Sequence, residues 1–226
     1  MPHRIRRGAA AVLAVSGLLL TAACGSGDDQ GDKAGKNGEL SAATMKAALL
    51  TAEDLPSGYQ AGQPGPSGGP ATTADKPECE PIAVFLNDTI KGAAKGGSVD
   101  FEGPGGGTQL SQQVFTFPGG EAAGFVRGIG AALERCTDFG ASVAGEKMTI
   151  GVRKIDGPEV GEESHSLNLT TEIKQLQMTF DIQVLVASEG TGMTRLTHVP
   201  GQEADKKKFA DLARRAGDKF VAGVRG

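Results

Sequence analysis

Cys24 is the residue whose type and position indicate a specific chemistry. It follows a basic segment with Arg4, Arg6 and Arg7 and an apolar run, Ala9 to Ala23, that ends in small residues. A charged start, a short hydrophobic run and small residues before a cleavage point are typical of a secretory signal, and the run is too short to span a bilayer comfortably. A cysteine directly after the small residues predicts a lipoprotein signal, in which the thiol becomes acylated.

The segment Leu19-Leu20-Thr21-Ala22-Ala23-Cys24 resembles the bacterial lipobox, with Thr21 where Leu or Val is commoner. The resemblance implies that the Cys24 thiol is alkylated with a diacylglyceryl group and becomes the new N-terminus after cleavage. Two lipid chains give stable anchoring, whereas one gives only marginal binding. We therefore expect residues 1–23 to be a signal peptide and Cys24 to tether the protein to the cell membrane, on its extracytoplasmic face. An ordinary secreted protein with an incidental cysteine is the alternative.

The residues after Cys24 have the composition of a linker. Residues 25–38 are mostly Gly, Ser, Asp, Lys, Gln and Asn, with almost nothing apolar. Such a stretch cannot bury enough surface to offset its ordering entropy. We therefore expect residues 24–38 to be the lipidated cysteine and a flexible stalk, and residues 39–226 to form one domain.

The charge of the mature chain restricts its partners. Removal of residues 1–23 leaves 203 residues and takes away three of the 23 basic residues but none of the 27 acidic ones, so the formal net charge changes from −4 to −7. A nucleic-acid binder would show clustered basic surface, so an acidic body argues against that class. With no Trp and one Tyr, the core must consist of Val, Leu, Ile, Ala and the nine Phe.

Two cysteines remain after acylation of Cys24, namely Cys79 and Cys136, in a compartment that permits disulfides. Two cysteines allow a single intramolecular pairing, so we expect a bridge between them. Closing a loop of about 57 residues would stabilise the fold by about 3–5 kcal/mol in the chain-entropy model. Two separate buried thiols are the alternative, and a metal site is disfavoured because the sequence has no C-x-x-C and few histidines.

Four segments have the apolar spacing of helices. The first follows Ser41, a residue of N-cap type, and stops at Leu55-Pro56-Ser57-Gly58; the second opens at Pro77 after a Pro- and Gly-rich loop. The third follows Pro118-Gly119-Gly120, and the fourth runs from about 202 to 222. The third helix has its apolar residues on one stripe, which suits a bridge to the second helix because Cys136 belongs to it: Phe125, Ile129, Leu133 and Cys136.

Period-two alternation predicts strands in the remaining segments. The clearest is Gln177–Ala187, where apolar residues alternate with polar ones, the pattern of an antiparallel sheet with one buried face. The other strands are expected at residues 98–101, 108–117, 148–153, 166–173 and 193–199. The order of elements predicts an α+β domain in which helices pack on one face of an antiparallel sheet of about five or six strands.

The segment Leu49-Leu50-Thr51-Ala52-Glu53-Asp54-Leu55-Pro56-Ser57-Gly58-Tyr59 resembles the signature of PknH-type extracellular sensor domains and their lipoprotein relatives in high-GC Gram-positive bacteria. The later Cys pair and the order of elements match over roughly Glu39 to Val224. The resemblance implies a bent antiparallel sheet with helices against it and a cleft for an extracellular ligand, without catalytic residues. Kinase-linked members have a transmembrane helix and more cysteines, so any signal from this chain must pass through another protein.

Hydrolase chemistry needs a nucleophile beside a base, and the material for it is sparse. His165 lies between two serines, but neighbouring strand residues point to opposite faces, so adjacency cannot build a triad. There is no G-x-S-x-G elbow. An enzyme would have to assemble an ionisable pair from Glu162, Glu163, Asp181 and His165. We therefore expect no catalytic residues.

Cofactor and metal motifs are also missing from the sequence. The segment 140–147 has Glu146 where a P-loop needs its Lys and is followed by a strand, so it predicts a turn, and the glycines of 103–107 predict a hairpin loop. Asp28-Asp29 and Glu162-Glu163 lack the EF-hand spacing. We expect no cofactor and no metal ion.

The last predicted helix has a face rich in basic residues. Such charges would attract anionic lipids, at about 1 kcal/mol each. Because Asp205, Asp211 and Asp218 are interleaved with them, a solvated helix face is the preferred interpretation. The basic residues of this face are Lys206, Lys207, Lys208, Arg214, Arg215 and Lys219.

These features predict a non-catalytic, lipid-anchored module at the cell envelope, which recognises a ligand in a cleft or docks on a membrane protein. Its expected partners are membrane lipid, through acylated Cys24, and an envelope ligand or membrane protein, but no nucleic acid. A cell-envelope enzyme acting on glycan or lipid and a passive structural or chaperone-like lipoprotein are the alternatives.

Overall fold

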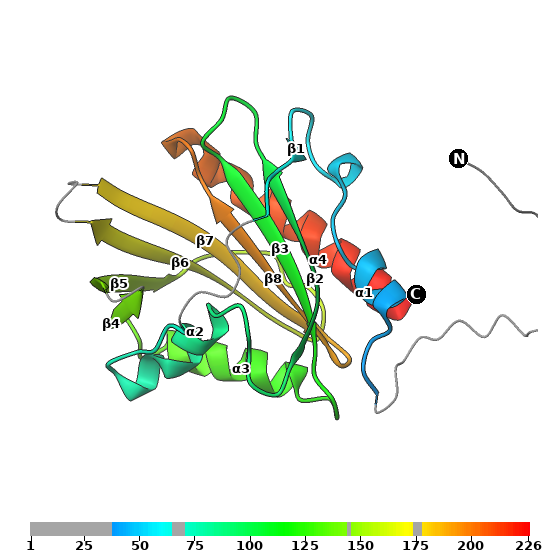
Figure 1. Cartoon of the computed structure of the whole chain (residues 1–226), viewed down its shortest axis with the longest axis horizontal. Coiled ribbons are helices and arrows are strands. Elements are labelled where there is room, and N and C mark those ends of the chain that lie inside the picture. The colour runs from blue at the N-terminus through cyan, green and yellow to red at the C-terminus, as the bar shows by residue number, and fades with distance from the viewer. Residues whose placement is uncertain (1–37, 65–70, 144–145, 174–177) are drawn as a thin grey trace, which may run out of the picture. The chain divides into compact units, whose positions relative to one another are not determined.

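The computed structural model describes residues 38–64, 71–143, 146–173 and 178–226. The predicted signal peptide, Cys24 and the predicted stalk up to residue 37 lie outside these residues. The described part is an antiparallel sheet with helices packed against it (Figure 1).

The sheet has eight strands, so the expected number of about five or six is too low. Two strands had no clear sequence pattern: β1 has only two residues, both exposed, and β4 contains a glycine within a short, weakly alternating run. The strands are β1 (Gln60–Ala61), β2 (Ala94–Glu102), β3 (Gln109–Thr116), β4 (Asp138–Val143), β5 (Glu146–Lys154), β6 (Glu163–Ile173), β7 (Met178–Glu189) and β8 (Gly192–Val199).

All neighbouring strands run antiparallel in the order β1-β2-β3-β8-β7-β6-β5-β4. Strands β4 to β8 follow one another as a meander, and β8 ends beside β3. The last strand therefore joins the early hairpin β2–β3 to the rest of the sheet, as Figure 1 shows.

In the part of the chain that the structure describes, four α-helices and three short 3₁₀ segments accompany the sheet. Ser41 caps α1 by accepting a hydrogen bond from the Thr44 N–H (3.1 Å). The first helix is shorter than predicted because the Asp54 carboxylate binds the Thr51 N–H and starts a separate turn. The segments are α1 (Ala42–Ala47), η1 (Ala52–Asp54), η2 (Pro77–Cys79), α2 (Glu80–Phe85), α3 (Ala122–Leu133), η3 (Glu203–Lys208) and α4 (Phe209–Arg225).

Helices cover both faces of the sheet, so the prediction of helices on one face is wrong. On β7, Val184 and Val186 belong to the core beneath α2 and α3, whereas Leu185 and Ala187 belong to the core beneath α4. The first half of β7 alternates apolar and polar residues as expected, but 184–187 is a continuous apolar run, which is typical of a strand buried on both faces. In Figure 1, α2 and α3 pack together below the strands, and α1 packs on α4 at the right.

The predicted disulfide is confirmed. Cys79 and Cys136 are bonded, with their Cα atoms 5.2 Å apart, and both are buried. The bond joins the start of α2 to the chain just after α3 and closes a loop of 57 residues. It therefore fastens α2 and α3 to each other as one unit on their face of the sheet.

A candidate ligand groove on the sheet

Among the described residues, α2 and α3 cover only one end of their face of the sheet. Paired residues of antiparallel strands point to the same side, and so do residues two apart. Asp100 on β2 pairs with Ser111 on β3, and Ser111 pairs with Thr197 on β8. Thr197 in turn pairs with Val184 on β7, which belongs to the core beneath α2 and α3. These side chains therefore share the α3 side. A second row of the same orientation lies two residues further along each strand: Glu102, Gln109 and Val199.

A groove with a volume of about 330 Å³ lies over these two rows. Gly62 and Gln63, just after β1, form one wall, where the Gly62 N–H donates to the Asp100 carbonyl (2.8 Å). A Cβ at Gly62 would stand 3.2 Å from the backbone of Phe101, so glycine allows this wall to lie against β2. The volume is at the lower end of the range of small-molecule sites, about 300 to 1,000 Å³.

Beyond the groove, the same side of the sheet becomes apolar. Ile182 is partly buried against the α3-side core, and Phe180, two residues earlier on β7, is 38 % exposed. Among the described residues, Phe180 is the large apolar side chain that remains exposed. The open end of this face therefore combines polar rows on β2, β3 and β8 with an apolar margin on β7.

Arg195 closes the inner end of the open face. It is 6 % exposed and lies on β8 beside Gln113, one row inward from Ser111 and Thr197. Its guanidinium donates to the carbonyls of Phe85 and Asn87 at the end of α2 and to the Gln113 side-chain oxygen. The guanidinium also lies over the Phe85 ring (5.4 Å to its centroid).

Burial lowers the pKa of Arg195 to about 10, while Asp88 opposes this shift, so the side chain stays charged at neutral pH. A buried cation is stable only where its donors have partners. The carbonyls at the end of α2 supply them, so Arg195 holds that end on the sheet. The sequence analysis did not single out this residue, although a charge at an inward position of a predicted strand was a usable signal.

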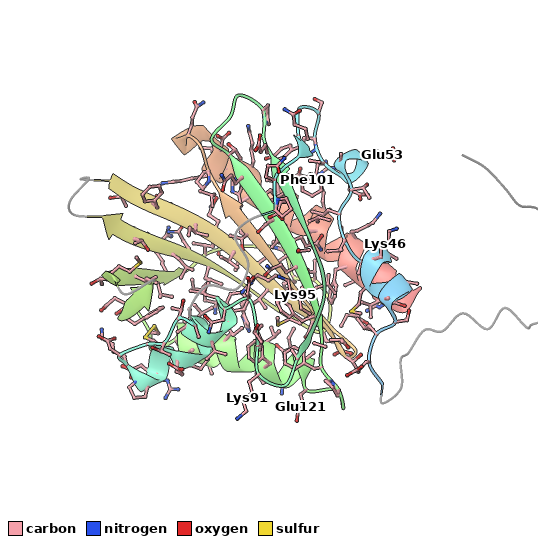
Figure 2. The ribbon with its side chains drawn as sticks, in the orientation of Figure 1. Lys46, Glu53, Lys91, Lys95, Phe101 and Glu121 are labelled. Carbon is pink, nitrogen blue, oxygen red and sulfur yellow. A yellow bond between two sulfur atoms is a disulfide. The ribbon has the colours of Figure 1, made fainter. Side chains whose placement is uncertain are left out.

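Figure 2 shows Lys91 and Lys95, which flank the start of β2.

A second buried polar cluster lies on the opposite face, beneath the start of α4. The His198 ring is fully buried, shares a hydrogen bond between Nδ1 and the Gln183 side-chain oxygen (3.1 Å) and stacks on Phe209. Its Nε2 has no hydrogen-bond partner among the described residues, and neither has the Tyr59 hydroxyl. Burial lowers the pKa of His198 to about 4, although Asp205 favours the charged form. His198 is therefore neutral at physiological pH.

The ionisable residues considered for an enzyme are not brought together. His165 pairs in register with Val186, so it lies on the α3 side, where its ring packs against Gly130. Burial, helped by Lys154, lowers its pKa. Asp181 has the opposite parity on β7 and therefore points to the α4 side.

Two of the three carboxylates of this set are in ion pairs. Glu163 pairs with Arg127 of α3 (3.0 Å). Asp181 pairs with Lys206 (2.7 Å), and this hydrogen bond lowers its pKa despite partial burial. Glu162 is exposed at the start of β6. Within the described residues, no three His, Cys, Asp or Glu side chains are grouped as a metal site requires.

Acidic partners occupy much of the basic face of the last helix. Four of the six basic side chains are in ion pairs, which supports the interpretation as a solvated face. Lys207 and Arg214 are exposed. The pairs are Lys206–Asp181, Lys208–Asp205 (2.8 Å), Arg215–Asp211 (2.8 Å) and Lys219–Asp54 (3.2 Å).

The first of the two glycine-containing segments connects strands, as predicted, because residues 103–108 join β2 to β3. In the segment resembling a P-loop, residues 140–143 belong to β4 and residues 146–147 to β5, while the expected turn at residues 144 and 145 lies outside the described residues. Neither segment precedes a helix, which a phosphate loop requires.

The signature segment 49–59 has a structural role. Asp54 accepts hydrogen bonds from the N–H and hydroxyl of Thr51 (2.8 Å each) and pairs with Lys219 of α4. The segment is thus fastened to α4, on the face opposite the groove. Three of its buried side chains belong to the core beneath α4, Leu50, Leu55 and Tyr59, and Leu49 packs in a smaller cluster with Phe220 of α4. Figure 2 shows Glu53 in this segment and Phe101 on β2 near it.

Comparison with solved structures agrees with this architecture. The extracellular domain of PknH from Mycobacterium tuberculosis is similar with a TM-score of 0.57 and 14% sequence identity, over 84% of this chain and 98% of that chain. The fold is of the PknH extracellular-domain type. At this identity, the similarity to the PknH domain shows the fold alone, and it confirms the resemblance at that level.

A putative uncharacterized protein from Mycobacterium smegmatis, the Rv0999 ortholog, is less similar, with a TM-score of 0.42 and 12% identity over 82% of this chain and 95% of that chain. No family model and no curated protein matches the sequence. In the part of the chain that the structure describes, no helix has the length and apolar character to cross a bilayer.

Replacing Arg195 should loosen α2 from the sheet. Arg195→Met leaves the carbonyls at the end of α2 without their charged donor, and we expect unfolding in urea to require about 3 kcal/mol less free energy. The free energy of unfolding of Arg195→Lys should lie between those of the wild type and Arg195→Met, because one ammonium cannot reproduce the forked geometry of the guanidinium. Arg153→Met, an exposed strand arginine on β5, is the matched control and should change stability little. If Arg195→Met and Arg153→Met lose equal stability, Arg195 does not hold α2 on the sheet.

His198 should make stability depend on pH. Its pKa is about 4 when folded and about 6.5 when unfolded, so the unfolded state binds more protons between these values. Stability is therefore full above pH 6.5 and decreases as the pH falls, by up to about 3 kcal/mol at pH 4. Urea titrations from pH 7 to 4 should show a smaller decrease for His198→Gln, whereas His165→Gln keeps the His198 contribution. If stability falls as much between pH 7 and pH 4 in His198→Gln as in the wild type, His198 is not the source of the pH dependence.

Proposed function

We propose that this chain is a lipid-anchored, extracytoplasmic ligand-binding or sensor module of the cell envelope that makes and breaks no bonds of its own. The observation that carries the proposal is the groove over Asp100, Ser111 and Thr197, because its volume lies within the range of small-molecule sites and its polar side chains can orient a ligand. The groove favours this function over a passive lipoprotein, which needs no such site.

Two further observations support the proposal. The fold is that of an extracellular domain, although at low identity. The residues required for the enzyme alternative are separated, since His165 and Asp181 point to opposite faces of the sheet. A module tethered only by lipid has to pass its signal to a membrane protein, and ligand binding beside the Arg195 contact to α2 offers a physical starting point for such a signal.

The anchor is tested by replacing the acylated thiol. In a bacterium that processes lipoproteins, we expect the wild-type chain to be shortened and to incorporate labelled palmitate, and Cys24→Ala to keep its full length and carry no label. The double variant Cys79→Ala/Cys136→Ala keeps Cys24 and is the control, which should still be labelled. Equal palmitate labelling of the wild type and Cys24→Ala would show that the anchor is wrong.

Ligand binding is tested by filling the groove. The full chain, extracted from cells in mild detergent, should carry a bound small molecule that native mass spectrometry detects as an added mass. Ser111→Trp places a large side chain in the groove and should remove this mass. Thr179→Trp changes an exposed strand residue on the other side of β7 and should retain it. If the wild type and Ser111→Trp give the same spectrum, the groove is not the binding site.

A further inference from the structure

The polar side chains of the groove differ in what they offer a ligand. Four of them carry amide or hydroxyl groups, which both donate and accept hydrogen bonds. The two carboxylates only accept when ionised. The four amide and hydroxyl side chains are Gln63, Gln109, Ser111 and Thr197, and the carboxylates are Asp100 and Glu102.

The charge of the groove argues against an anionic ligand. Among the described residues that line it, Asp100 and Glu102 are acidic and none is Lys, Arg or His. A phosphate or carboxylate placed here would meet like charges, and no cationic side chain belongs to the described lining. The nearby Arg195 does not supply one, because its guanidinium already donates to the end of α2 and to Gln113.

The four amide and hydroxyl side chains also argue against a simple amine. An ammonium group only donates hydrogen bonds, so it would use the two carboxylates and leave the donors of Ser111, Thr197 and Gln109 without an acceptor on the ligand. Polar groups that lose water without gaining a partner reduce affinity. A ligand with many hydroxyl groups satisfies donors and acceptors alike.

The size and the apolar part of the groove fit the same ligand class. Neighbouring strands are about 4.8 Å apart and alternate residues about 6.8 Å apart, so two rows on three strands form a floor of about 10 by 7 Å. Val199 contributes an apolar surface to that floor, on which the C–H face of a sugar ring can pack. The volume of about 330 Å³ is suited to one or two such rings.

We infer that the ligand of the groove is a neutral saccharide, bound through its hydroxyl groups by Ser111, Thr197 and the side-chain amides. This inference rests on the proposed function, since it names the chemical class of the ligand that the groove would bind. The carboxylates of Asp100 and Glu102 then accept hydrogen bonds from sugar hydroxyls, as charged acceptors do strongly.

The test uses saccharides released from the envelope of the producing cells by mild acid hydrolysis and separated by ion exchange into neutral, cationic and anionic pools. The full chain in detergent is immobilised and exposed to each pool. We expect retention of the neutral pool, unchanged between about 50 and 500 mM salt because no charge pair is involved. Ser111→Ala/Thr197→Ala should reduce this retention about tenfold, whereas Thr179→Ala, on the opposite side of β7, should leave it unchanged.

The opposing outcomes separate the inference from the proposed function. Salt-sensitive retention of the cationic pool, lost in Asp100→Asn/Glu102→Gln, would overturn the saccharide class and leave ligand binding in place. Retention of the anionic pool alone would do the same. If no pool is retained and the native chain carries no added mass, both the inference and the proposed function fail.

Discussion

The buried guanidinium of Arg195 determines how α2 packs on the sheet. A cation this deep in the structure is stable only because the carbonyls of Phe85 and Asn87 and the Gln113 side chain accept its hydrogen bonds. It therefore fastens the end of α2 to β8, at the centre of the sheet. The Cys79–Cys136 bond fastens the start of α2 to the chain after α3. Through these two links, a helix of only six residues is held at both ends.

The position of α2 also decides where the sheet stays open. Inward of Arg195 the α3-side face is covered and apolar, and outward of it the rows over Ser111 and Thr197 face the groove. The groove is therefore bounded on one side by a contact that must remain intact for the fold. On the opposite face, α1, α4 and the signature segment pack against the sheet.

Much of the fold could be predicted from local pattern. The spacing of Phe125, Ile129 and Leu133 predicted α3, and the Cys pair predicted the bridge, because both depend on periodicity or on counting. Other features could not be predicted in this way. The two-residue strand β1 has no side-chain pattern of its own and exists because β2 offers it a free edge. The second layer of helices could not be predicted either. Residues 184–187 face both layers, but so short an apolar run does not by itself distinguish a strand buried on one face from a strand buried on both.

The candidate site shows the same division. The amino-acid sequence by itself determined the chemical character of the chain: the cysteine pair, the acidic balance and the sparse material for catalysis, together with the prediction that Cys24 is acylated. Only the tertiary structure decided that Asp100, Ser111 and Thr197 form one row, that His165 and Asp181 lie on opposite faces, and that Arg195 reaches α2. The reason is that strand pairing joins residues far apart in the chain, 11 positions for Asp100 and Ser111 and 86 for Ser111 and Thr197. The register between strands is set by packing of the whole core.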